Sequence, residues 1–238
     1  MRRKKARRMR RIKRIFAAAV ILLVVFAAGR TSFVQGFLNH WNVKSEATLT
    51  AEGYPESLVQ LYEKNEEARQ FVLDYKKNGN NEQPIDISSD ITDGKIPLFL
   101  QWDERWGYRT YGDNFLAITG CGPTALSMVY VGLTGDTSMN PYAVAQMAQE
   151  DGFYVNGSGS SWSMMTELAT KLGLSAQELS LNEDSIQQEL SQGHPIICIM
   201  GPGDFTTSGH FIVLTGVDSE GKITVNDSNS KKNSNKAW

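Results

Sequence analysis

The stretch GHFIVLTGVDSEGKITVND, residues 209–227, decides the fold because it contains a clear hairpin pattern. Two runs rich in β-branched residues, HFIVLTGV and KITVND, flank the turn formers Asp218-Ser219-Glu220-Gly221. A third apolar run, PIICIM at residues 195–200, comes before the hairpin. Together the three runs predict an antiparallel sheet in the C-terminal part of the chain.

Towards the N-terminus, four segments have the composition and the end signals of helices. They cover residues 123–135, 141–152, 162–173 and 183–193. Ahead of them, IPLFLQW (96–102) predicts a short strand, and the aromatic, Gly-rich residues 103–120 predict a long loop. Helices followed by an antiparallel sheet are typical of an α+β fold, which we expect for residues 96–238.

Residues 37–95 are predicted to form a polar stalk, an amphipathic helix and a linker. The helix covers residues 55–77, where apolar side chains recur every three to four positions and Pro55 suits the first turn. The linker, residues 78–95, is dense in turn formers. We favour a helix that packs on the main domain, with a spacer or an oligomerisation surface as the alternatives.

The first 36 residues carry a membrane-targeting pattern. Residues 1–14 contain ten Lys or Arg and no acidic residue, and residues 15–36 begin with the uncharged run IFAAAVILLVVFAAG. This order predicts either a single-pass signal anchor or a cleaved signal peptide, because the uncharged run is short for a spanning helix. In both cases the basic segment stays in the cytoplasm. The main domain then lies outside the cell membrane, or is secreted after cleavage.

The charge distribution argues against nucleic acid as a partner. The chain has 24 basic and 26 acidic residues, so its formal net charge is -2. Because ten basic residues lie in the first 14 positions, the rest of the chain holds 14 basic and 26 acidic residues. A protein that binds phosphate backbones needs a basic face, and this acidic body does not provide one.

Cys121 is the candidate nucleophile. It lies in TGCGPTALSMV (119–129), between two glycines, and Pro123 suits the first turn of the helix that follows. A thiol at a helix N-terminus is stabilised as the thiolate, which is the reactive form of cysteine. The glycines also let a substrate backbone approach closely.

A base for this nucleophile must come from three histidines. His40 lies beside the apolar N-terminal segment, and His194 occupies a turn between a helix and a strand. His210 opens an apolar strand directly after a Gly-rich loop, where a polar side chain can face a cleft. We therefore expect His210 to be the base.

Asp227 is the candidate for orienting the imidazole of His210. In a hairpin the start of one strand lies beside the end of the next, so both residues are expected at the same rim of the sheet. Asn226 alternates to the opposite face, and Asn229 and Asp218 are weaker candidates. The backbone amide of Cys121 and the side chain of Gln101 are candidate oxyanion donors.

We expect no metal and no cofactor. The histidines and the two cysteines are scattered without zinc-binding spacing, and no Gly-rich phosphate loop is present. The acidic stretch 86–93 fits no calcium loop and is interpreted as solvated linker. Export would permit a disulfide between Cys121 and Cys198, and the sequence leaves that possibility open.

Four motifs in order, IPLFLQWDERWGY, GCGPTALSMV, GHFIVLTGVD and ITVNDSNSKKNS, resemble the C39-like family of bacterial, papain-like cysteine peptidases. The resemblance covers roughly residues 96–238. It implies a papain-like α+β fold, a peptide or protein substrate, and a Cys121, His210 and Asp227 triad. It also implies that Gln101 contributes to the oxyanion site and that Cys198 is a core residue.

The resemblance leaves several functions open. Relatives that remove double-glycine leaders carry the Gln much nearer the Cys, so we do not expect leader processing. An enzyme on cell-wall peptides, an acyl transferase, and a non-catalytic, surface-anchored peptide-binding module are the alternatives to a protein-cleaving enzyme. Four aromatic residues either line a substrate groove or pack the loop: Trp102, Trp106, Tyr108 and Tyr111.

Overall fold

A computed structural model describes residues 44–238 of the chain. Residues 1–49 and residues 50–238 fall into separate units, and all contacts discussed below lie in the second unit. The predicted basic segment and the predicted anchor or signal peptide lie outside the described residues. Among the residues that are described, no helix is long and apolar enough to span a membrane.

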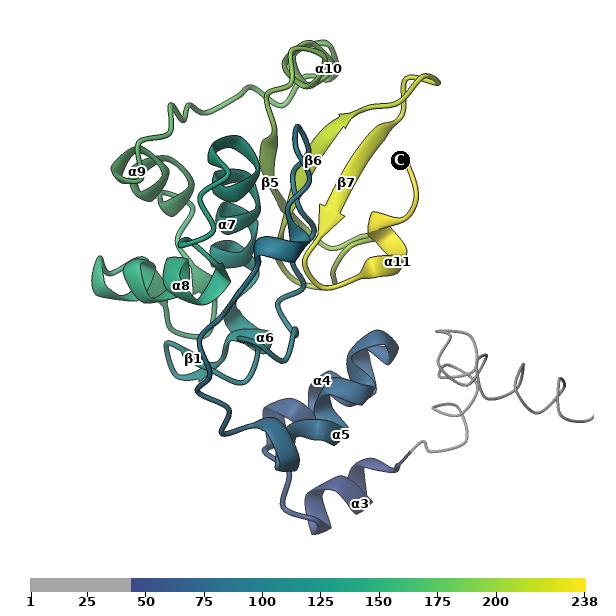
Figure 1. Ribbon diagram of the computed structural model, residues 1–238. Helices are drawn as coiled ribbons and strands as arrows, with labels where there is room; N and C mark the ends of the chain where they lie inside the picture. The colour runs from purple at the N-terminus through teal and green to yellow at the C-terminus, as the bar shows by residue number, and fades with distance from the viewer. Residues whose placement is uncertain (1–43) are drawn as a thin grey trace, which may run out of the picture. The chain divides into compact units, whose positions relative to one another are not determined.

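The described elements are helices and short antiparallel strands (Figure 1). In chain order they are α3 (Glu46–Ala51), α4 (Glu56–Lys64), η1 (Glu66–Ala68), α5 (Arg69–Asn78), η2 (Ser88–Asp90), β1 (Thr110–Tyr111), β2 (Asn114–Phe115), α6 (Leu116–Thr119), α7 (Cys121–Thr134), α8 (Pro141–Glu150), β3 (Tyr154–Val155), β4 (Gly159–Ser160), α9 (Met164–Lys171), α10 (Glu183–Ser191), β5 (Ile196–Met200), β6 (His210–Val217), β7 (Ile223–Asp227) and α11 (Lys231–Ser234). Helices α7 to α10 and strands β5 to β7 confirm the predicted α+β order.

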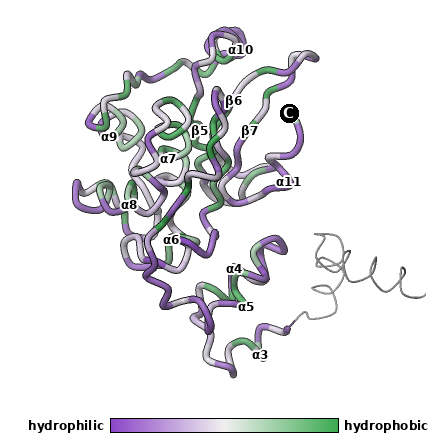
Figure 2. Tube along the Cα trace, viewed as in Figure 1, coloured by the Kyte–Doolittle hydropathy of each residue, from purple (hydrophilic) through white to green (hydrophobic). Residues whose placement is uncertain are grey.

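The main sheet has the order β5-β6-β7, and both pairings are antiparallel. The central strand β6 is buried on both faces because its side chains alternate between two apolar clusters. Phe211 and Val213 join the larger cluster with α7, whereas Ile212 and Leu214 join a smaller cluster with α10. Figure 2 shows the hydrophobic segments concentrated where α7 meets β5 and β6.

Helix α7 is the central helix of the larger cluster. Its residues are apolar on almost every side, and it contacts β6, α8 and α9. Gly135 ends it in the left-handed region, with φ of 71°, where a glycine carries no Cβ penalty. Helix α7 therefore has packing partners on several sides, and Cys121 is its first residue.

The predicted single helix over residues 55–77 is wrong in one respect, because it is broken at Asn65. This residue has extended backbone angles, φ of -129° and ψ of 101°, and separates α4 from η1 and α5. Its side-chain oxygen accepts a hydrogen bond from the backbone N–H of Glu67. Apolar spacing continues through the break, so periodicity alone could not reveal it.

The helix pair nevertheless packs on the rest of the unit. The rings of Phe71 and Tyr108 stack with centroids 4.1 Å apart, and the Tyr108 hydroxyl donates to the carbonyl of Phe71 at 2.6 Å. Packing on the main domain is the arrangement that we favoured from the sequence.

The linker region is also fixed to the domain. Ile87 is fully buried in the larger cluster, and Arg105 forms ion pairs with Asp90 at 2.6 Å and Asp103 at 2.8 Å. Residues 78–95 therefore belong structurally to the folded unit.

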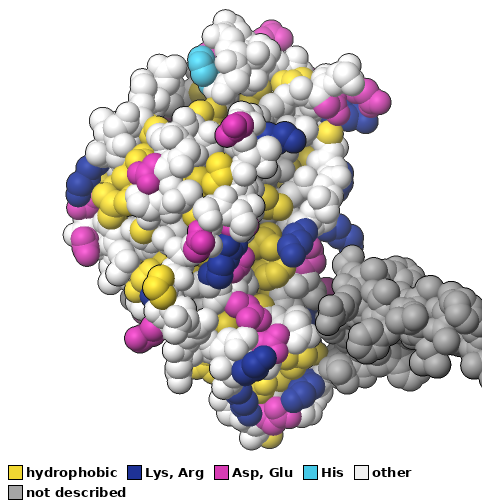
Figure 3. All heavy atoms as spheres, in the orientation of Figure 1, with side chains coloured by type: hydrophobic (Ala, Val, Ile, Leu, Met, Phe, Trp, Pro, Cys, Tyr) yellow, Lys and Arg dark blue, Asp and Glu magenta, His cyan; other side chains and the backbone are white. Residues whose placement is uncertain are grey.

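Figure 3 shows acidic and basic side chains interspersed over one face of the molecule.

The strand predicted over residues 96–102 does not form. Pro97 lacks an N–H, and the carbonyls of Ile96 and Pro97 accept instead from the side-chain amide of Asn226, each at 3.0 Å. The predicted loop 103–120 contains the hairpin β1–β2 and helix α6. All four aromatic residues discussed above are buried in packing positions: Trp102, Trp106, Tyr108 and Tyr111.

Candidate active site

Cys121 is the first residue of α7, and it is half-buried. Its N–H lies in the first turn of α7, where a backbone donor has no acceptor within its own helix. Gly122 follows in close contact with strand β4. A Cβ at that position would meet Ser160 Oγ at 2.6 Å. The glycine is therefore required by packing beside the thiol.

His210 begins β6 and is 6% exposed. Its imidazole is hydrogen-bonded to the carboxylate of Asp227 and lies close enough to the thiol of Cys121 for each group to shift the pKa of the other. The bond to Asp227 joins His210 Nε2 to Asp227 Oδ1 at 2.8 Å. Because Nε2 is occupied by the carboxylate, Nδ1 is the nitrogen left for the thiol.

The strand register explains why His210 meets Asp227. Asp227 pairs with Ile212, two residues after His210, so the two side chains are diagonal neighbours on one face of the sheet. The hairpin pattern predicted that both would lie at the same rim. Their catalytic roles stay predictions.

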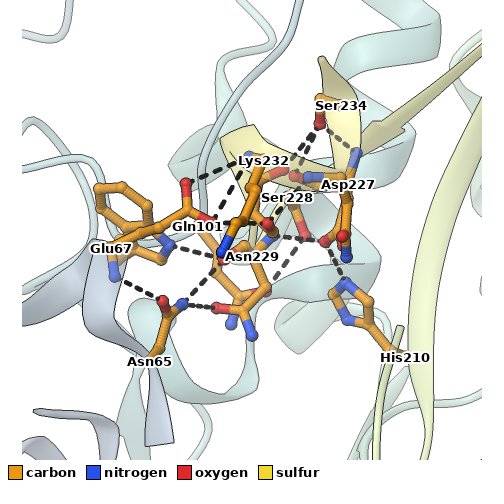
Figure 4. Close-up of polar contacts among 12 residues, drawn as sticks. Asn65, Glu67, Gln101, His210, Asp227, Ser228, Asn229, Lys232 and Ser234 are labelled. Atoms are coloured by element: carbon orange, nitrogen blue, oxygen red, sulfur yellow. Dashed lines mark hydrogen bonds and ion pairs between the residues drawn. The ribbon is translucent and has the colours of Figure 1, made fainter. Parts of the chain in front are cut away.

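The carboxylate of Asp227 is 1% exposed, and hydrogen bonds occupy both of its oxygens. Oδ1 accepts from His210 and from the backbone N–H of Asn229 at 2.8 Å, and Oδ2 accepts from Asn233 Nδ2 at 2.8 Å. Figure 4 shows this network around Asp227, with His210 at its edge. These partners hold the buried carboxylate in a fixed orientation towards the imidazole.

The environment changes the pKa of the Cys121 thiol in opposing directions. Burial raises the pKa, but the hydrogen bond and the charge of His210 lower it, as do the backbone N–H groups of Phe211 and Gly122. The net effect is a pKa below the ordinary thiol value. The site therefore favours the thiolate.

The pKa of His210 changes in the complementary direction. Burial lowers it, but the hydrogen bonds and charges of Asp227 and Cys121 raise it to about 9. A lowered thiol pKa and a raised imidazole pKa together favour a thiolate–imidazolium ion pair near neutral pH. Such a pair combines a nucleophile with a proton donor.

Gln101 lies in the same network, and both polar atoms of its side chain bind residues other than Cys121. Its Nε2 donates to the carbonyl of Ala117 at 2.7 Å, and its Oε1 accepts from Ser228 Oγ at 3.1 Å. Ala117 belongs to α6, directly before the nucleophile, and Ser228 follows Asp227. Gln101 thus ties together the two segments that carry the thiol and the carboxylate.

The other candidates from the sequence have different surroundings. Asn229 donates its backbone N–H to Asp227, whereas Asp218 accepts from backbone N–H groups within the hairpin turn. His194 is exposed and bonded to Glu189, and His40 lies outside the described residues. Cys198 is a free thiol in β5, and burial raises its pKa. Cys121 is also a free thiol.

Sequence reasoning missed Asn233 as a partner of Asp227. Asn233 lies in α11, six residues after Asp227, within the motif ITVNDSNSKKNS. An amide in a short polar helix carries no signal of its own, because its role depends on how the chain turns back. Residues 44–238 contain no group of three or more His, Cys, Asp or Glu side chains arranged to hold a metal ion.

Comparison with known proteins adds one finding to this geometry. A family model described as "Peptidase_C39 like family" matches residues 94–238. No curated protein and no solved structure matches the chain. The matched region contains Gln101, Cys121, His210 and Asp227, and it leaves α4 and α5 outside.

Proposed function

Because the chain belongs to the C39-like peptidase family, we propose that it is a cysteine peptidase that hydrolyses peptide bonds through Cys121, His210 and Asp227. The observation that carries the proposal is the series of Cys121 thiol, His210 imidazole and buried Asp227 carboxylate, in which the ring is hydrogen-bonded to the carboxylate and interacts electrostatically with the thiol. This series supplies a nucleophile, a base and an orienting group, the three parts of a nucleophilic triad. The order of elements around it supports a papain-like arrangement.

In the first half of the proposed reaction, the Cys121 thiolate attacks the carbonyl carbon of the scissile peptide. A tetrahedral intermediate forms with negative charge on the former carbonyl oxygen. The imidazolium of His210 then donates its proton to the leaving nitrogen, and the C–N bond breaks. The products of this half are a free amine and a thioester on Cys121.

In the second half, neutral His210 takes a proton from a water molecule, which attacks the thioester. The carboxylic acid product leaves, and the thiolate–imidazolium pair is restored. Asp227 keeps Nδ1 of the ring directed at the thiol and stabilises the imidazolium through Nε2.

The N–H of Cys121 is the first candidate donor to the oxyanion, because a donor in the first turn of a helix has no acceptor within that helix. Gln101 is the second. The side-chain nitrogen of Gln101 carries two hydrogens, and one of them is donated to the carbonyl of Ala117. The other hydrogen remains available as a donor. The bond to Ala117 would fix the direction of that remaining donor.

We place this activity outside the cell membrane, with the N-terminal segment as an anchor or a cleaved signal. The support is the basic segment followed by the apolar run in the first 36 residues. Protease treatment of intact cells tests the placement. Digestion of the catalytic domain before lysis, or its presence in the medium, is expected, and digestion only after lysis would contradict it.

The catalytic proposal is tested by comparing Cys121→Ala, His210→Ala and Cys198→Ala in the purified full chain. The first two variants should each lose at least about 10³-fold in peptide hydrolysis, because triad members act as a unit. Cys198→Ala should keep its activity, since that free thiol lies opposite Ile212 in the sheet and packs against the smaller apolar cluster. Circular dichroism checks that each variant is folded.

Retained hydrolysis in either folded triad variant would end the peptidase proposal. Product analysis by mass spectrometry identifies the substrate class. Protein fragments, released cell-wall peptides and amide-linked adducts each have a distinct mass signature.

A further inference from the structure

The segment that follows Asp227 holds the Asp227 carboxylate in place. The N–H of Asn229 donates to Oδ1 and the side-chain amide of Asn233 donates to Oδ2, both at 2.8 Å. The position of residues 229–233 therefore determines where the carboxylate lies relative to His210.

Two residues at the corner between α4 and α5, Asn65 and Glu67, hold that segment in turn (Figure 4). Asn65 Nδ2 donates to the backbone carbonyl of Asn229 at 2.8 Å and to its side-chain oxygen at 2.9 Å. Glu67 Oε1 accepts from Ser230 Oγ at 2.6 Å, and Glu67 Oε2 accepts from the N–H of Lys232 at 3.2 Å.

Ser230 completes a continuous path to the carboxylate. Its hydroxyl donates to Glu67 and accepts from the N–H of Asn233 at 3.1 Å. Asn233 then donates to Asp227, which bonds to His210. The path from Glu67 to the imidazole passes through hydrogen bonds at every step.

The backbone at this corner is shaped for the contact. Asn65 leaves the helical conformation between α4 and η1, and its Oδ1 accepts from the N–H of Glu67 at 2.9 Å. One side chain thus fixes Glu67 while its other end binds Asn229. The corner lies outside the region matched by the family model, which begins at residue 94.

We propose that Asn65 and Glu67 are positioning residues that hold Asp227 against His210, so that the catalytic unit extends beyond the family domain into the α4–α5 corner. This inference rests on the proposed function. It assigns to the helix pair a role in the chemistry, which is separate from its packing on the domain.

Removing the hydrogen bonds from Asn65 or Glu67 to residues 229–232 has a specific expected effect. If residues 229–233 shift, the Asp227 carboxylate moves away from Nε2 and stabilises the imidazolium less. The thiolate–imidazolium pair then persists over a narrower pH range, so its loss on the alkaline side occurs at lower pH. Substrate contacts at Cys121 are unchanged, so kcat should fall about tenfold while KM changes little.

The variants for the test are Glu67→Ala, Glu67→Gln and Asn65→Asp, each in the full chain. Glu67→Gln keeps an oxygen for Ser230 and covers the case in which Glu67→Ala does not fold. Asn65→Asp keeps the oxygen that caps Glu67 and removes the amino group that donates to Asn229. The matched control is Glu66→Ala, because Glu66 is 79% exposed and pairs with Arg69 on the same helix pair.

The readouts are kcat, KM and the pH dependence of Cys121 alkylation by limiting iodoacetamide, located by peptide mapping. We expect Glu67→Ala and Asn65→Asp to lower kcat and to move the alkaline limb of the pH–activity profile to lower pH. Glu67→Gln should show a smaller shift in the same direction, and Glu66→Ala should match the unaltered chain.

Two outcomes overturn the inference, and they can be told apart. If the unaltered chain alkylates at Cys121 only like an ordinary thiol, the proposed function fails and the inference fails with it. If the unaltered chain has an activated Cys121 but the folded Glu67 and Asn65 variants behave like Glu66→Ala, only the inference fails.

Discussion

At the scale of single residues, the proposed chemistry depends on a proton that passes between Cys121 and His210. The thiol alone would be a weak nucleophile near neutral pH, and a buried imidazole alone would lose its proton. Each group shifts the pKa of the other in the direction that favours charge separation. Asp227 adds a fixed negative charge on the far side of the ring, which keeps the proton on His210.

The pKa directions predict a bell-shaped pH dependence of kcat/KM. Activity should rise as Cys121 loses its proton, at a pH below the ordinary thiol value, and fall as His210 loses its proton at about pH 9. The sign follows from the active form, which needs an ionised thiol and a protonated imidazole. Stopped assays across the pH range would show both limbs.

Alkylation of Cys121 supplies the control for this profile. In His210→Ala the acid limb should move to higher pH, because the cation that stabilises the thiolate is gone while the burial that opposes it remains. An unchanged acid limb in His210→Ala would mean that another group activates the thiol.

At the scale of elements, the start of α7 is shaped by its contact with β4. Gly122 faces Ser160, and an added Cβ would lie 2.6 Å from Ser160 Oγ and 3.0 Å from Met164 Cε. Ser160 Oγ also bonds to the buried hydroxyl of Tyr111 at 2.8 Å, so it cannot move freely. The glycine beside the nucleophile is thus a packing requirement in addition to any role in admitting substrate.

Gly122→Ala should therefore destabilise the protein despite its better helix propensity. Overpacking costs about 1–3 kcal/mol, against a propensity gain of about 1 kcal/mol, so a net loss of about 1 kcal/mol is expected. Cys121 alkylation should also slow, because the start of α7 must shift. Urea unfolding and alkylation rates measure the two effects.

Gly209→Ala is the matched control, because Gly209 precedes His210 and an added Cβ there meets nothing within 4 Å. It should leave stability within about 0.5 kcal/mol of the unaltered chain. A stability gain of about 1 kcal/mol in Gly122→Ala would show that propensity dominates and that Ser160 yields.

Element-scale signals in the sequence were reliable where they are local. The hairpin turn and the glycine that ends α7 each act within a few residues, and each has the predicted position. The strand predicted over residues 96–102 is absent because a strand needs a partner strand. The carbonyls of Ile96 and Pro97 are bound instead by the side chain of Asn226.

At the scale of the whole molecule, α4 and α5 belong to the folded unit of residues 50–238. The Phe71–Tyr108 stack and the bonds of Asn65 and Glu67 join them to segments distant in the chain. Elements joined in this way are expected to unfold together with the domain.

Phe71→Ala should lower the free energy of unfolding by about 3–4 kcal/mol, because Phe71 is buried and stacked. Unfolding should remain a single transition when followed by both far-ultraviolet circular dichroism and tryptophan fluorescence. Leu181→Ala is the control, since Leu181 is 97% exposed and its loss should cost less than about 0.5 kcal/mol. Two separate transitions would show that the helix pair is an independent attachment.

The sequence by itself determined the α+β order, a helix with Cys121 at its N-terminus, the hairpin, and the juxtaposition of His210 and Asp227. These features depend on signals that act over a few residues or within one hairpin. Only the tertiary structure decided the break at Asn65, the absence of a strand before Gln101, and the partners of Asp227. Asn65 meets Asn229 and Glu67 meets Ser230 across 164 and 163 residues of chain, so no local pattern encodes either contact.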